Sequence, residues 1–206
     1  MTDWAAYRQA VFGDPYMVWH DGADFSEIAR RFREDPGLVL RMLRAGIREN
    51  DAVAAEAARN LEPTEDQVAA IAELLEEELP AATGGTRSEI ATSLHTLGGP
   101  AELAQHVVDV LLGADHWGVR LEAAIRLAGF APTPALVEAA EAGVRDDDYL
   151  VRFHSANTLL RWAGRDEDIS DDEELFGLLV DDAGPDGWAR VAERLAREVP
   201  VPPVTA

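Results

Sequence analysis

Apolar residues recur at three- and four-residue intervals along most of the chain, as in LVLRMLRAGI (38–47) and TEDQVAAIAELLEEEL (64–79). This period predicts amphipathic helices, and no segment shows the sustained two-residue alternation of a strand. Thr64 and Gln67 have the spacing of a capping box at a helix start. Glycines are expected to end several helices in the left-handed conformation, at Gly98-Gly99, Gly113, Gly129 and Gly143. Four prolines each precede one of the predicted helices: Pro36, Pro63, Pro100 and Pro132.

The helical pattern contains an internal repeat. DHWGVRLEAAIRLAG, from Asp115, aligns without a gap with DDYLVRFHSANTLLRWAG, from Asp147, at an offset of 32 positions. An Ala-x-x-Leu pattern recurs with Ala at 58, 91, 124 and 156, and weaker copies begin at Ala29 and Ala192. Since one helix pair cannot bury its apolar face alone, the pairs are expected to stack. The sequence therefore predicts an all-α superhelix, or solenoid, of about five to six helix pairs.

Three segments follow from this repeat. Residues 1–35 are expected to form an N-terminal helical cap, residues 36–198 the repeats, and residues 199–206, VPVPPVTA, a flexible tail. The predicted cap is rich in bulky aromatic residues that could close the first repeat: Trp4, Tyr7, Phe12, Tyr16 and Trp19.

The pattern D-x-[WY]-x-V-R-x-x-[AS]-A-x-x-L resembles the second helix of HEAT repeats, especially the short repeats first noted in phycobilin lyases. The resemblance covers residues 86–162 and extends more weakly over 36–198. Proteins with such repeats are mostly scaffolds, adaptors and inhibitors, and a minority are lyases or DNA glycosylases. In the family, Asp and Arg near the start of the second helix form a ladder between neighbouring repeats. The resemblance implies that role for Asp115, Arg120, Asp147 and Arg152.

Helical geometry, at about 100° per residue, separates a core face of each second helix from an opposite face. In HEAT-like stacks the opposite face lines the concave surface. Its apolar members are expected to mark a contact surface with Phe153 at the centre, although solenoid curvature or the C-terminal segment could cover them instead. The predicted partner-binding residues are Glu89, Thr92, Leu121, Glu122, Ile125, Leu150, Phe153, His154, Asn157 and Arg161.

The charge of the chain narrows the choice of partner. Its formal net charge is −21, and all 18 basic residues are arginine. Nucleic acids and anionic membranes are poor partners for such a surface, because binding phosphates requires a basic footprint. A basic protein is the expected partner. The alternative is that the acidity is shared by a whole salt-adapted proteome, and the arginine bias is typical of GC-rich bacteria.

No residues with catalytic or metal-binding spacing were found. The five histidines never occur as His-x-x-x-His, and the acidic runs 146–148 and 166–174 are interpreted as helix caps rather than calcium loops. The sequence contains no P-loop, dinucleotide fingerprint or G-x-S-x-G, so no catalytic residue or cofactor is predicted. It also contains no cysteine, signal peptide or membrane-spanning run, which favours a cytoplasmic protein.

The leading functional hypothesis is a scaffold or inhibitor that grips a basic protein on its concave face. An immunity protein for a basic toxin is one concrete version, and an adaptor fits equally well. The alternative is a HEAT-like enzyme. A DNA glycosylase could use Trp117 and Trp188 as concave-face aromatics, and a bilin lyase is suggested by the repeat type alone.

Overall fold

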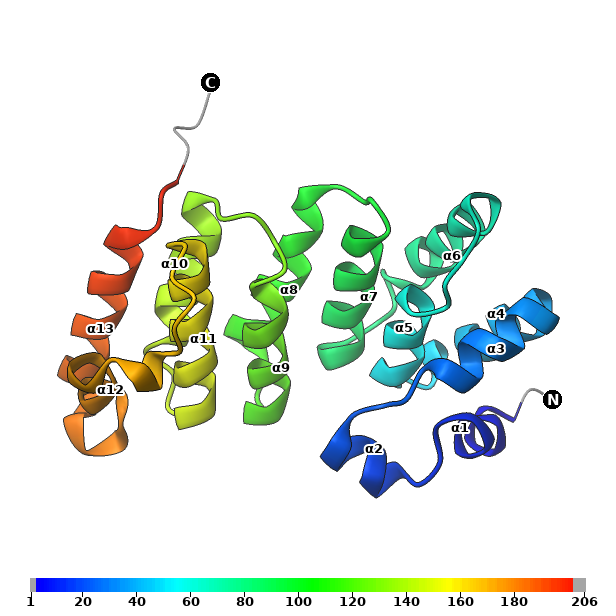
Figure 1. The fold of residues 1–206 in the computed structure, drawn as a ribbon, viewed down its shortest axis with the longest axis horizontal. Coiled ribbons are helices and arrows are strands. Elements are labelled where there is room, and N and C mark those ends of the chain that lie inside the picture. The colour runs from blue at the N-terminus through cyan, green and yellow to red at the C-terminus, as the bar shows by residue number, and fades with distance from the viewer. Residues whose placement is uncertain (1–2, 202–206) are drawn as a thin grey trace. The chain divides into compact units, whose positions relative to one another are not determined.

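The computed structural model describes residues 3–201, apart from the side chains of Trp19 and Asp181. Over this range the regular elements are thirteen α-helices and three short 3-10 helices, without a strand (Figure 1). None of the described helices combines the length and apolar character needed to cross a bilayer. The prediction of an all-α protein is therefore confirmed. Residues 202–206 of the predicted tail lie outside the described residues.

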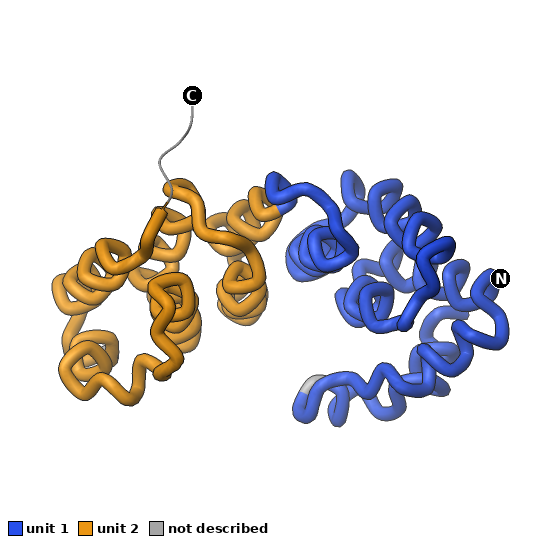
Figure 2. The backbone as a smooth tube through the Cα atoms, turned by 45° about the horizontal axis from the view of Figure 1, so that its top comes forward, with its two compact units in different colours: residues 1–103 blue, residues 104–206 orange. Residues whose placement is uncertain are grey.

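Contacts divide the chain into two compact units, residues 1–103 and residues 104–206 (Figure 2). The first unit consists of α1 (Trp4–Phe12), α2 (Pro15–Asp21), α3 (Ser26–Glu34), α4 (Pro36–Arg48), α5 (Ala52–Arg59), α6 (Glu65–Glu78), α7 (Gly84–Thr96) and η1 (Ala101–Leu103). Within it, α4 packs on α5 and α6, and α7 packs on α5 and α6.

The N-terminal helices share one hydrophobic core with α4–α7. The Trp4 ring packs against Gly46 of α4, where an added Cβ would lie 2.4 Å from Cε2 of the ring. The indole Nε1 donates a hydrogen bond of 2.9 Å to Asp51 at the start of α5. Of the predicted cap aromatics, Trp4 and Phe12 are buried, but Tyr16 is 62% exposed. The contacts thus divide the chain at residue 103, whereas the sequence analysis placed its boundaries at 35 and 198.

The second unit repeats the packing of helix pairs. It consists of α8 (Ala104–Gly113), α9 (Trp117–Leu127), α10 (Pro134–Gly143), α11 (Tyr149–Trp162), η2 (Ile169–Asp171), α12 (Glu173–Leu179), η3 (Asp181–Ala183) and α13 (Gly184–Glu198). Here α8 packs on α9 and α10, α11 packs on α9 and α10, and α13 covers α10, α11 and α12.

The repeated Ala-x-x-Leu positions form the centre of these contacts. Every one of them is buried. Because buried positions are close-packed and accept few residue types, the Ala-x-x-Leu pattern can be recognised in the sequence although its outer copies are weak. The eight residues are Ala58, Leu61, Ala91, Leu94, Ala124, Leu127, Ala156 and Leu159.

Several polar residues at helix ends follow ordinary capping rules, whereas the glycines do so only in part. The capping box of Thr64 and Gln67 is present, and Gly98 has the expected positive φ of 97°. Asp148 caps α11, since its carboxylate accepts from the backbone N–H of Leu150. The prediction is wrong for Gly113, Gly129 and Gly143, none of which has a positive φ, and α10 extends through Gly143. A Cβ there would meet Ser155 on α11, so the glycine is required for close helix packing.

We expect Gly143→Ala to lower the free energy of unfolding by about 1–3 kcal/mol, because overpacking an interior costs about that much. The added Cβ would lie 2.2 Å from Ser155 Oγ and 2.9 Å from Ser155 Cβ, so turning the hydroxyl away does not remove the clash. Gly113→Ala in α8 is the matched control, since nothing lies within 4 Å of its Cβ position. The control should stabilise by up to about 1 kcal/mol. Urea unfolding followed by circular dichroism measures both, and equal effects would contradict the packing role.

Candidate functional site

The second helices of unit 2, α9 and α11, pack side by side and present apolar residues to solvent. Trp117, Leu121 and Ile125 follow one another at four-residue intervals, which places them on one face of α9. The exposed fractions are 43% for Trp117, 44% for Ile125 and 39% for Leu150 of α11. We call Trp117, Leu121, Ile125, Leu150 and Phe153 the α9–α11 face.

Trp117, rather than Phe153, is the most exposed aromatic residue of the α9–α11 face. Phe153 is half-buried, with its ring centroid 6.0 Å from that of Tyr149 and 5.3 Å from that of His154. Trp117 stacks on His116 with ring centroids 5.8 Å apart and otherwise faces solvent. Because exposed indole surface is available to a partner and buried phenyl surface is not, Trp117 replaces Phe153 as the expected energetic centre.

Two predicted partner-binding residues, Glu89 and Thr92, lie in unit 1 and not with the other eight. The assignment of Glu89 to a solvent-facing surface is wrong. Its side chain is fully buried between α5 and α7, where it forms an ion pair with Arg59 and accepts a 3.2 Å hydrogen bond from Ser93. Thr92 is half-buried and its hydroxyl donates to the Ser88 carbonyl. The small side chains of α5 allow the close approach that buries Glu89.

The expected Asp–Arg ladder exists in altered form around Arg120. Its guanidinium makes a bidentate pair with Asp146, at 2.7 and 2.9 Å, and donates to the backbone carbonyls of Ala114 and Asp115. The neighbouring repeat therefore contributes the carboxylate of Asp146 instead of Asp147. In these hydrogen bonds Asp115 accepts through its backbone carbonyl and not through its carboxylate.

Arg152 has an interior structural role. It is fully buried, with its guanidinium 3.9 Å from the centroid of the Trp188 ring. It donates to the carbonyls of Leu179, Asp146 and Asp147 at 2.9–3.0 Å. The indole of Trp188 donates to Val180, so this tryptophan belongs to the packing of α13 and not to an open binding face.

A cavity of about 530 Å³ adjoins the α9–α11 face and is lined by four of the predicted residues. These are Ile125 of α9 and three residues of α11, namely His154, Asn157 and Arg161, and the segment 164–168 closes the cavity. The Asn157 amide holds this segment, because it donates to Asp168 and accepts from the backbone N–H of Ile169, both at 2.8 Å. Residues 164–168 were not among the predicted site residues, because a loop that returns onto a helix carries no periodic signal in the sequence.

Two titratable groups of the cavity have shifted pKa values. Burial lowers the pKa of His154, against the opposing charges of Asp168 and Glu122, so its imidazole is neutral at pH 7. Burial alone would raise the pKa of Asp168, but hydrogen bonds from Ser170 and Asn157 outweigh it and hold that pKa below its ordinary value. The cavity thus combines a neutral imidazole with an ionised carboxylate.

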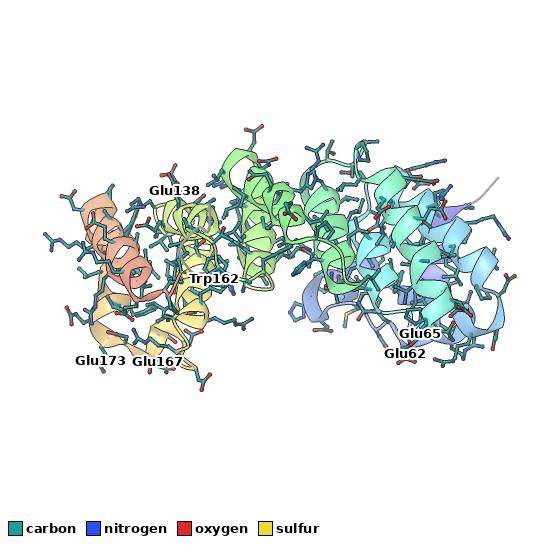
Figure 3. The ribbon with its side chains drawn as sticks, turned by 90° about the horizontal axis from the view of Figure 1, so that it is seen from above. Glu62, Glu65, Glu138, Trp162, Glu167 and Glu173 are labelled. Carbon is teal, nitrogen blue, oxygen red and sulfur yellow. The ribbon has the colours of Figure 1, made fainter. Side chains whose placement is uncertain are left out.

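Acidic side chains cover much of both units, and Figure 3 shows several of them projecting outward. Glu62 and Glu65 belong to unit 1, and Glu138, Glu167 and Glu173 belong to unit 2; all five are exposed. Among the described residues, no three His, Asp or Glu side chains gather in a way that could hold a metal ion.

We expect His154 to titrate below pH 6.5, its ordinary pKa, because desolvation disfavours the charged imidazole. The unfolded chain then takes up the proton first, so the folded state loses stability as the pH falls from 6.5 towards the folded-state pKa. NMR titration of the imidazole C–H resonances measures the pKa. His154→Gln should remove this part of the pH dependence of unfolding. A pKa at or above 6.5 would contradict the burial.

Comparison with known proteins adds no relative: no protein-family model, no curated protein and no solved structure matches this chain.

Proposed function

We propose that this protein binds another protein, of basic charge, through the α9–α11 face. The observation that carries the proposal is the clustering of Trp117, Ile125 and Leu150, all exposed, on two packed helices of a strongly acidic chain. Contiguous exposed apolar groups with polar neighbours mark interaction sites in monomeric proteins. Isolated exposed apolar residues would not support the same conclusion.

The packing order supports a HEAT-like solenoid as the scaffold of that face. In unit 1, first helix α4 contacts first helix α6, and second helix α5 contacts second helix α7. In unit 2, the same holds for α8 with α10 and for α9 with α11. Layers of this kind are what stacked helix pairs produce. Within each unit the second helices then lie side by side and offer their outer sides to a partner, as they do in scaffolds and inhibitors of this type.

Charge supports the choice of a basic partner. Residues 104–206 hold 20 Asp and Glu against 9 Arg, a net charge of −11 for unit 2. Such a field accelerates the encounter with a positively charged protein and disfavours acidic competitors. An inhibitor of a basic enzyme, such as an immunity protein for a toxin, is the most concrete form of the proposal.

We expect Trp117→Ala to weaken partner binding without unfolding the protein, because its indole is exposed and central apolar groups dominate binding energies. Selection from a random phage-displayed peptide library against the wild type should enrich peptides of net positive charge. These peptides should lose about 2 kcal/mol or more of binding energy against Trp117→Ala, a typical value for a hot spot. Tyr16→Ala, which removes an even more exposed aromatic residue from unit 1, is the control and should bind as the wild type does.

Acidic enriched peptides, or basic ones that bind both variants alike, would refute the proposed face. Circular dichroism melts of the two variants exclude unfolding as the cause of any loss.

The DNA-glycosylase alternative makes a separate prediction. We expect no measurable binding of duplex DNA at about 0.15 M salt, because counterion release requires a basic surface that this chain lacks. Fluorescence anisotropy of a labelled duplex, with a salt series, measures it. Micromolar affinity that weakens with salt would favour the enzyme instead.

A further inference from the structure

The cavity beside the α9–α11 face has a preformed boundary. Ile125 belongs to both the face and the cavity, so a partner seated on the face reaches the cavity directly. Asn157 fixes the opposite wall through its two 2.8 Å hydrogen bonds to Asp168 and Ile169. Because the wall is already ordered, a guest entering the cavity would not incur the entropic cost of ordering it.

One of the two positive side chains of the cavity is neutralised by ion pairs. Arg165 is ion-paired with Glu167, with Glu198 at 3.2 Å and with Asp172 at 3.5 Å. Arg161 has no ion pair with another described residue, but it is solvent-exposed at the rim and its long side chain can turn away.

Negative groups remain in excess. Within the described part of the chain, Asp166 forms no hydrogen bond or ion pair, and it is exposed. Asp168 accepts from Asn157 and Ser170, which leaves part of its lone-pair capacity open. The lining residues and their ion-pair partners comprise five carboxylates and two guanidinium groups, which leaves a net charge of −3.

The shape and chemistry of the cavity suit an arginine side chain better than a lysine side chain. A guanidinium is planar and can stack on the neutral imidazole of His154 while it donates to Asp166 and Asp168. Its aliphatic stem can lie along Ile125. A lysine ammonium is a compact, strongly hydrated charge without a stacking surface.

We infer that this cavity receives an arginine side chain of the partner protein, an inference that rests on the proposed function of the α9–α11 face. The guanidinium lies over His154 between the carboxylates of Asp166 and Asp168, and the partner's apolar residues cover Trp117 and Leu150. The α9–α11 face and the cavity together therefore recognise an arginine that is flanked by apolar residues.

The test is an NMR titration of the ¹⁵N-labelled full chain with N-acetyl-L-arginine amide. The neutral, nearly isosteric N-acetyl-L-citrulline amide is the matched control. The arginine probe should shift the amide resonances of Ile125, His154 and Asn157 saturably at millimolar concentration, with at least about fivefold tighter binding than the citrulline probe, the order expected for one charge at contact distance in water. Absence of saturable shifts, or equal binding of the two probes, would overturn the inference.

Substitutions of two exposed residues decide whether the cavity binds a cation or an anion. Asp166→Asn should weaken binding of the arginine probe about fivefold, and Arg161→Gln should strengthen it by a similar factor, because each changes one charge at the rim. If instead N-acetyl-L-glutamate amide binds and Arg161→Gln abolishes that binding, the cavity is an anion site and the inference is wrong.

This titration needs no partner, so its outcome is independent of the peptide selection. If the arginine probe binds while no basic peptide is selected, the inference about the cavity stands and the proposed function fails. If selected peptides depend on Trp117 but bind equally after their arginines are replaced by citrulline, the proposed function stands and the cavity inference fails.

Discussion

Close packing of helix pairs through small residues is the constraint on which the rest of this structure depends. Gly46 lies against the Trp4 ring and Gly143 lies against Ser155, at separations that leave no room for a methyl group. The buried alanines at the repeated positions also allow neighbouring helices to approach closely, although their methyl groups take more room than a glycine hydrogen. Because the helices approach so closely, a leucine three residues after each alanine can fill the space between neighbouring pairs. The exposed side of each second helix is then free to carry other residues.

Close packing also determines which polar groups become structural. Arg152 cannot reach solvent from within unit 2, so three backbone carbonyls and the Trp188 ring satisfy its guanidinium. Arg120 binds the carboxylate of the following helix pair through Asp146. The Arg120–Asp146 pair thus links α9 to the loop that precedes α11, and α9 and α11 together carry the α9–α11 face. Arg120 and Arg152, which the family pattern marks as part of a ladder, thus have structural roles next to the α9–α11 face without belonging to it.

The acidity of the chain serves several purposes that composition alone cannot separate. Some carboxylates cap helices, as Asp148 does, others neutralise arginines, as Glu167 and Glu198 do beside Arg165, and Asp172 does both. Asp166 belongs to neither group, and it lies on a cavity beside exposed apolar residues. A functional role for the charge is therefore best sought at positions where a carboxylate has no structural partner.

The sequence by itself determined the helices, their apolar faces and the buried register from Ala58 to Leu159, because these properties depend on local periodicity. It also placed Ile125, His154, Asn157 and Arg161 on one face, and these four residues do line a common cavity. Only the tertiary structure decided that Glu89 is buried, that Asp146 pairs with Arg120, and that segment 164–168 returns to close the cavity. The physical reason is that periodicity specifies which side of a helix is apolar, whereas the distance between helices and the path of a loop depend on side chains that meet across the fold.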